Sequence, residues 1–376
     1  VETAGAEVDV AAYDNGATAL ILAAEHGHEE MVKWLVEGGQ AKVDASDVYG
    51  WTALMMAAHN GHVGVTKLLV EAGGAEVNAG DSNGVTALMM AARGSRVDLV
   101  KWLVEWGGAN VNAATKSGCT ALMLAVLAGS DAVEMVTWLV QKGKADVDAV
   151  DSQQRTALMM AAENGEEDLV LCLLESGAAN VDAADSCGRT ALMLAVRNRG
   201  RVKWLLGNGL QKINDAADIC GRSAYTFDLN HGREGLVRLL VEMGGANVSA
   251  VADDGATVLM MAAHGGDRGV VQWLVERGGA SVETPDRNGV TALMTAALSG
   301  RESVVEWLVE TAGATVDSAD CEGRTALMAA AAGGHVEVVK WLVKTGRANV
   351  ALEDSGGKTT VMIAAISGKE EVVKWL

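Results

Sequence analysis

Apolar and polar residues form blocks that return at a nearly fixed interval along the chain. Each block opens with a threonine or serine and continues with a run of mostly apolar residues. The interval is 34 residues, except for 36 after Thr120 and 33 after Thr190. A fixed period of this length predicts a solenoid, in which each unit packs on its neighbours. The recurring position is occupied by Thr18, Thr52, Thr86, Thr120, Thr156, Thr190, Ser223, Thr257, Thr291, Thr325 and Thr359.

The block at 81–113 predicts two helices and a turn. Thr86 is suited to cap a first helix, and the nearly continuous apolar run at 87–92 indicates that this helix is buried on most sides. A glycine about nine positions after the threonine, as at Gly61, predicts a left-handed residue that ends the helix. A second helix follows with apolar residues on one face, as in 338–343. An Asp-x-x-Gly segment, which suits a type I turn, then leads into the next block.

Composition agrees with the copying of one small unit. The 376 residues include 45 Gly and 16 Met but only one Phe and one Pro. Since compact cores usually divide beyond roughly 250 to 300 residues, a chain of this length is expected to be a repeat array or several domains. The repeated pattern favours the array.

Charge and cysteine content exclude several classes of partner and location. The 30 Lys and Arg against 49 Asp and Glu give a formal charge of −19, which repels a phosphate backbone or an anionic membrane surface. We therefore expect no nucleic acid partner. The five cysteines form no CxxC pair, and their odd number does not suit a secreted disulfide framework. This indicates an intracellular, reducing compartment, most simply the cytoplasm, although a targeting sequence upstream of Val1 would leave an organelle open.

The sequence contains no recognisable active site. No apolar run approaches the roughly 18 residues of a membrane span, so no direct membrane insertion is expected. Motifs of the HExxH, GxxxxGK[ST] and GxSxG types are missing from the sequence. The histidines at 26–28 and 59–62 recur 34 residues apart at the end of the first helix, which is typical of structural positions rather than metal ligands. We therefore predict no enzyme activity, no cofactor, no metal and no small-molecule substrate.

Two residue types recur at fixed places in the block. Methionine stands one turn into the first helix, where we expect it to fill the core; the positions are 55, 89, 123, 159, 193, 260, 294, 328 and 362. Tryptophan recurs in the second helix, where we expect it to pack between successive second helices, an exposed outer ladder being the alternative. Its positions are 34, 102, 138, 204, 273, 307, 341 and 375.

The consensus G-x-T-A-L-M-x-A-A-x-x-G-H-x-x-V-V-K-W-L-V-E-x-G-G-A-x-V resembles the ankyrin repeat. This resemblance implies an all-α fold, an ankyrin-repeat solenoid of stacked helix-turn-helix units with short β-turn fingers. It covers 1–376 as one continuous array that starts and ends within a repeat. Because Thr-Ala-Leu-Met replaces the family's Thr-Pro-Leu-His, the histidine bridge of the family is not expected. The repeats start near 14, 47, 81, 115, 151, 185, 218, 252, 286, 320 and 354.

The resemblance also implies where partners bind. In ankyrin proteins the turn tips and the end of the first helix form a concave face that contacts other proteins, and these positions vary between copies here. Aromatic residues and arginine are favoured anchors at interfaces. Trp106, one turn after Trp102, is a candidate on the outer face. The candidates on the concave face are Tyr49, Trp51, His59, Arg93, Arg155, Arg189, Arg197, Arg222 and Arg324.

These features predict a non-enzymatic protein-interaction scaffold that bridges or braces subunits of a larger assembly. The alternatives are a regulatory or targeting ankyrin region of a larger enzyme or channel, and a structural spacer without a specific ligand. The pattern is least regular around Tyr225 and Phe227, where either drift or a hinge or docking site explains the sequence.

Overall fold

The chain folds into a series of short helix pairs. The computed structural model describes residues 7–12, 15–175, 179–197 and 233–376. Its helices are α-helical apart from one 3-10 turn and one π-helical turn, and in the described residues no strand extends beyond an isolated bridge. The all-α fold predicted from the sequence is confirmed.

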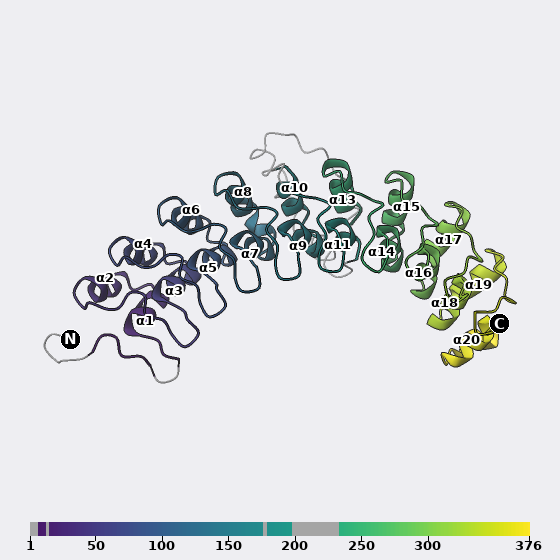
Figure 1. The fold of residues 1–376 in the computed structure, drawn as a ribbon, viewed down its shortest axis with the longest axis horizontal. Coiled ribbons are helices and arrows are strands. Elements are labelled where there is room, and N and C mark those ends of the chain that lie inside the picture. The colour runs from purple at the N-terminus through teal and green to yellow at the C-terminus, as the bar shows by residue number, and fades with distance from the viewer. Residues whose placement is uncertain (1–6, 13–14, 176–178, 198–232) are drawn as a thin grey trace. The chain divides into compact units, whose positions relative to one another are not determined.

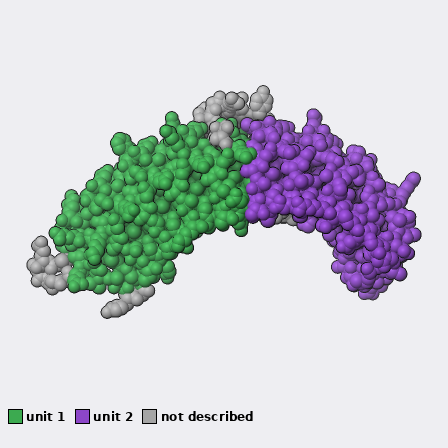
Figure 2. Space-filling model, viewed as in Figure 1, with its two compact units in different colours: residues 1–161, 168–180 green, residues 162–167, 181–376 purple. Residues whose placement is uncertain are grey.

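The described residues fall into two units, which Figure 2 distinguishes by colour. Unit 1 comprises 1–161 and 168–180, and unit 2 comprises 162–167 and 181–376. In each unit the first helices of successive repeats lie side by side in one row, and the second helices form another row (Figure 1). Loops that we call fingers extend from the first-helix row, on the side away from the second helices (Figure 1).

Unit 1 contains five helix pairs, with α9 and α10 lying mostly in this unit. Its first helices are α1 (Ala19–Glu25), α3 (Ala53–Asn60), α5 (Ala87–Arg93), α7 (Ala121–Leu127) and α9 (Ala157–Asn164). Its second helices are α2 (Glu29–Glu37), α4 (Val63–Glu71), α6 (Val97–Glu105), α8 (Val133–Gln141) and α10 (Glu167–Glu175). The 3-10 turn η1 (Ser130–Ala132) precedes α8, at the place where the period lengthens to 36.

Unit 2 follows the same plan. Its first helices are α11 (Ala191–Arg197), α14 (Val258–Gly265), α16 (Ala292–Leu298), α18 (Ala326–Gly333) and α20 (Thr360–Ile366). Its second helices are α13 (Arg233–Arg238) with the π-turn η2 (Leu239–Met243), α15 (Arg268–Glu276), α17 (Glu302–Glu310), α19 (Val336–Lys344) and α21 (Glu370–Trp375).

The first helices of most repeats begin at a threonine cap, and several end at a glycine, as the sequence predicts. Thr86 has extended backbone angles, and its hydroxyl oxygen accepts the N–H of Met89 at 3.4 Å, which satisfies one of the free amides of α5. The same cap opens eight further first helices, those that follow Thr18, Thr52, Thr120, Thr156, Thr190, Thr257, Thr291 and Thr325. Gly61 ends α3 with a φ of 79°, a conformation that costs glycine little.

The methionines predicted to fill the core do so. Met55, Met89 and Met123 are each 1% exposed, between first helices of neighbouring repeats. Met362 is the exception at 52%, and α20 packs against α18 but has no described first helix on its other side. Burial of this position therefore depends on the next repeat in the stack.

The tryptophans follow the predicted packing in part. Trp273 and Trp307, on α15 and α17, are buried, whereas Trp34 on α2 is 49% exposed. The Nζ atom of Lys67, one repeat earlier, lies 5.7 Å from the ring centroid of Trp102, a cation–π distance. The tryptophans are therefore best buried where repeats pack on both sides of them. Trp204 lies outside the described residues.

The junction between α11 and α14 differs from the other repeat junctions. The helix α11 packs against both α13 and α14. The N–H of Asn247 donates to the carboxylate of Asp182, 65 residues earlier, whereas the corresponding bond from Glu76 to Asp44 spans 32 residues. The first part of the predicted repeat near 218, with Tyr225 and Phe227, lies in 198–232, outside the described residues, whereas α13 and η2 fall in its second part. The described residues form ten helix pairs, and the eleventh repeat stays a prediction.

Candidate functional site

Each finger is held by its first residue, an aspartate in most repeats. In the finger of α5, the Oδ1 atom of Asp81 accepts the N–H groups of Asn83 and Val85, both at 2.8 Å. Asp47 does the same for Tyr49 and Trp51, at 2.9 and 2.8 Å. These turns fix the direction in which the finger side chains point.

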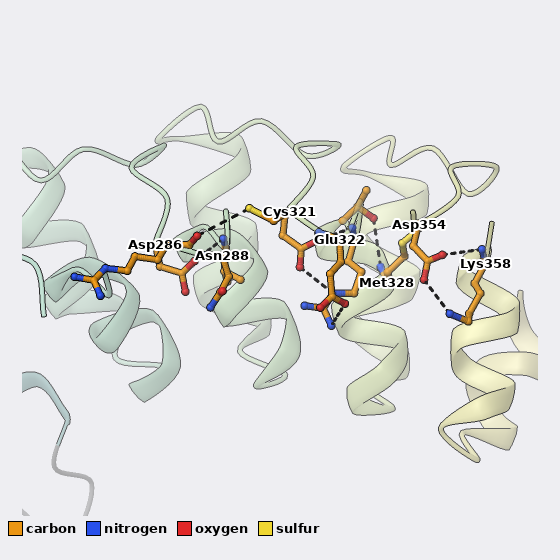
Figure 3. A network of polar contacts seen from close by, with 12 residues as sticks. Asp286, Asn288, Cys321, Glu322, Met328, Asp354 and Lys358 are labelled. Atoms are coloured by element: carbon orange, nitrogen blue, oxygen red, sulfur yellow. Dashed lines mark hydrogen bonds and ion pairs between the residues drawn. The ribbon is translucent and has the colours of Figure 1, made fainter. Parts of the chain in front are cut away.

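Neighbouring fingers are joined through their backbones. The N–H of Ser82 donates to the carbonyl of Tyr49 at 3.0 Å, and the N–H of Lys116 donates to the carbonyl of Asn83 at 2.8 Å. In unit 2 the N–H of Cys321 donates to the carbonyl of Asn288 at 2.8 Å, and Figure 3 shows other polar contacts of the same fingers. Because these amides already have partners, recognition at the fingers falls on side chains.

A groove of about 650 Å³ lies between the fingers and the first helices of unit 1. Its floor comes from α3, α5 and α7 and is largely apolar. The floor residues are Met56, Met89, Met90, Arg93 and Leu124. The finger wall comes from four successive fingers and consists of Asn15, Asp47, Tyr49, Trp51, Asp81, Ser82, Asn83, Val85, Thr115, Ser117 and Cys119.

Four residues predicted from the sequence meet at this groove. Tyr49, Trp51 and Arg93 line it, and His59 lies edge-on to the Trp51 ring with centroids 5.7 Å apart. Tyr49 is 63% exposed and Trp51 is half-buried. The exposed Tyr49 ring lies in the same groove as the Trp51 ring, above partly apolar floor residues. A bound ligand would remove water from these side chains, which favours binding.

The other predicted arginines differ from Arg93 in their contacts. The guanidinium of Arg155 lies 2.8 Å from Asp151, that of Arg189 lies 2.6 Å from Asp185, and that of Arg324 lies 2.8 Å from Asp320. Each pair joins the first and fifth residues of one finger. These arginines brace their own fingers, and the Asp-x-x-x-Arg spacing is the sequence signal that could have indicated it.

The remaining candidates lie elsewhere. Trp106 follows the end of α6, is 77% exposed, and does not line the groove. Arg197 is the last residue of α11, and Arg222 lies outside the described residues.

Histidines join the repeats at a position that sequence reasoning treated as an ordinary helix end. A ring nitrogen of His62 lies 3.0 Å from the carbonyl oxygen of Glu25, and His335 makes the same contact with Leu298 at 2.9 Å. The guanidinium of Arg301 donates to the carbonyl of His264 at 3.1 Å. These side chains satisfy free carbonyls at the end of the preceding first helix. The recurrence of histidine or arginine directly before several second helices was the available signal.

The environment of Asp185 shifts its titration. Burial acts to raise the pKa of this carboxyl, but hydrogen bonds from the Arg189 side chain and from the backbones of Arg189 and Cys187 outweigh it, so the pKa is lowered. The same contact raises the pKa of Arg189. The ionised pair therefore stabilises the folded finger.

We expect Asp185→Asn to lower the free energy of unfolding by about 1–3 kcal/mol at neutral pH, because Arg189 loses its buried partner. The folded-state pKa of Asp185 lies below the unfolded value of about 3.9, so its contribution is present above about pH 4 and is lost as the pH falls through the folded-state pKa. Thermal unfolding followed by circular dichroism from pH 7 to pH 3 measures this. The difference between wild type and variant should shrink with acidification.

Asp286→Asn is the matched control for this prediction. Asp286 holds its finger through the N–H groups of Asn288 and Val290 and has no arginine at the fifth position. Its substitution should cost less at neutral pH. Equal losses for the two variants would contradict a stabilising role of the Asp185–Arg189 ion pair.

Comparison with known proteins agrees with the fold. The family model described as ankyrin repeats, in three copies, matches residues 3–81, 74–151, 130–216, 227–320 and 312–376. The chain belongs to the ankyrin repeat family. Ankyrin repeats are generally protein–protein interaction modules, and the family is typically non-enzymatic. No curated protein matches this ankyrin chain.

Two further observations concern the described part of this ankyrin array. None of its helices combines the length and apolar character needed to cross a bilayer. Its His, Cys, Asp and Glu residues form no group of three or more able to hold a metal ion.

Proposed function

We propose that this ankyrin chain is a non-enzymatic scaffold that binds an extended segment of another protein in the groove of unit 1. The observation that carries the proposal is the groove itself, with Tyr49 and Trp51 above an apolar floor. The three spacings of about 10 Å between the four fingers give room for roughly nine residues of extended chain. Pockets that bury aromatic anchors are the usual centres of binding energy.

Bridging of subunits follows if unit 2 takes a second partner. Its fingers differ in chemistry from the groove, since Arg324 lies between Asp320 and Glu322, and Lys358 lies near Asp354 (Figure 3). A charged finger face and an apolar groove suit different ligands. One chain with both surfaces is able to hold two partners at once.

Selection of random peptides displayed on phage against the full chain tests the proposal. We expect at least one peptide class to bind Trp51→Ala or Tyr49→Ala about tenfold or more weakly, a loss of about 1.4 kcal/mol in binding. Tyr49→Ala serves as the second variant because its side chain is largely exposed and its loss should not unfold the finger. Bridging predicts a second class that is insensitive to both variants.

Trp106→Ala is the control, since Trp106 is an exposed tryptophan outside the groove. Fluorescence anisotropy gives each affinity, and circular dichroism checks that the variants remain folded. Peptides that lose affinity with Trp106→Ala and keep it with both groove variants would refute the proposed site.

A further inference from the structure

The groove contains a cation without an internal partner. Arg93, the last residue of α5, is exposed on the groove floor. Within the part of the chain that the structure describes, it makes no ion pair and no side-chain hydrogen bond. Arg155, Arg189 and Arg324 each have a carboxylate partner in their own finger. The Arg93 charge is therefore available to a ligand.

The neighbours of Arg93 on the first-helix row are not acidic. The same position holds His59 in the preceding repeat and Leu127 in the following one, and acidic residues return only two repeats away, at Glu25 and Glu163. The row thus presents a single guanidinium between an imidazole and an exposed leucine. This local charge is opposite in sign to the net charge of the chain.

Two carboxylates also line the groove, on the finger wall. Asp47 and Asp81 each accept two backbone N–H groups at 2.8 to 2.9 Å, so one oxygen of each carboxylate is engaged within its own turn, although the negative charge remains. Arg93 lies on the helix floor, and its guanidinium has no hydrogen bond or ion pair with a described residue. An incoming group therefore meets one unpaired positive charge.

The apolar surroundings favour pairing with a carboxylate. Met56 and Leu124, which are partly exposed, lie on the same floor, and covering them removes water from around the guanidinium. A charge pair in such a partly desolvated place is stronger than one in bulk water, and arginine forms two parallel hydrogen bonds with a carboxylate. Because the fingers' backbone amides are already bonded to each other, addition of a ligand strand to them is disfavoured.

We propose that the ligand of this groove is an extended protein segment with one aspartate or glutamate flanked by apolar residues. The carboxylate pairs with Arg93, and a neighbouring apolar or aromatic side chain packs against Trp51. A run of several acids does not fit, because a chain with a net charge of −19 repels it. This inference rests on the proposed function of the groove and adds the chemistry of its ligand.

Sequencing of the phage-selected peptides tests the composition. We expect groove-binding peptides, defined by weaker binding to Trp51→Ala, to share one acidic residue within about four positions of an apolar or aromatic residue. Enrichment of basic peptides among them would overturn the inference and leave the groove as a binding site. Loss of all sensitivity to Trp51→Ala would instead overturn the proposed site.

Charge reversal tests the contact. Arg93→Glu should lower the affinity of the chain for a groove-binding acidic peptide about tenfold or more. Replacing the acidic residue of the peptide by lysine should restore part of its affinity for this variant. Lys116→Glu is the matched control, because Lys116 is an exposed finger residue that does not line the groove, and its reversal changes the net charge equally. Equal weakening by the two variants would show a long-range charge effect and overturn the contact with Arg93.

Discussion

Met89→Ala is expected to lower the free energy of unfolding by about 2–5 kcal/mol, the usual range for a large-to-alanine change in a core. Met89 is 1% exposed on α5, and α5 packs against both α3 and α7, so its truncation is expected to leave a cavity in the core. In a solenoid the energy lies in the interfaces between neighbours, and this change weakens an interface directly. Urea unfolding followed by circular dichroism and by tryptophan fluorescence measures the loss.

Met362→Ala provides the control within the same chain. Met362 occupies the equivalent position in the repeat of α20 but is 52% exposed. Its truncation should change stability by no more than about 0.5 kcal/mol, as for surface substitutions. Similar losses at the two positions would contradict the conclusion that contact with the next repeat makes this methionine part of the core.

Gly118→Ala is expected to cost about 2–5 kcal/mol. Gly118 has a φ of 79°, which costs other residues about 1–2 kcal/mol, and a Cβ atom there would lie 2.8 Å from the Asp151 Cα of the next finger. The backbone of the next finger is unable to move aside as a flexible side chain does. The steric clash is therefore expected to add about 1–3 kcal/mol to the cost. The expected result is a weakened finger ladder beside the groove, visible as a lower unfolding midpoint.

Gly108→Ala separates the two causes. Gly108 has a similar φ of 71°, and a Cβ atom built there has no neighbour within 4 Å. This variant should show the conformational cost alone, about 1–2 kcal/mol. If Gly108→Ala destabilises the chain as much as Gly118→Ala, the close approach of successive fingers contributes nothing measurable.

The periodic part of the fold could be predicted from the sequence because the same local physics acts in every copy. A threonine before an apolar run caps a helix wherever it occurs, and a buried methionine position is evident once it recurs in register. The exposure of Met362 differs because burial depends on the following repeat. Likewise, the direct link between the fingers of Asp182 and Asn247 depends on how the chain passes from α11 to α13, which no periodic pattern specifies.

The candidate site was predictable in its location and less so in its chemistry. Variable positions at the turn tips and at the end of the first helix indicated Tyr49, Trp51 and Arg93, and these residues line the groove. The same reasoning treated Arg155 and Arg189 as equivalent to Arg93, although finger geometry pairs them with Asp151 and Asp185. Whether a finger arginine is paired depends on an aspartate four residues before it, a spacing that is visible in the sequence but whose meaning becomes clear only from the geometry of the turn.

Photo-crosslinking of the phage-selected peptides to the full chain tests the central claim most directly. A photoreactive residue placed in each peptide reports its contacts by mass spectrometry, independently of any substitution in the protein. We predict that at least one peptide class crosslinks to groove residues on the segments 47–56 and 81–93. If every crosslink falls on the second helices, on Trp106 or on unit 2, the groove of unit 1 is not the binding site.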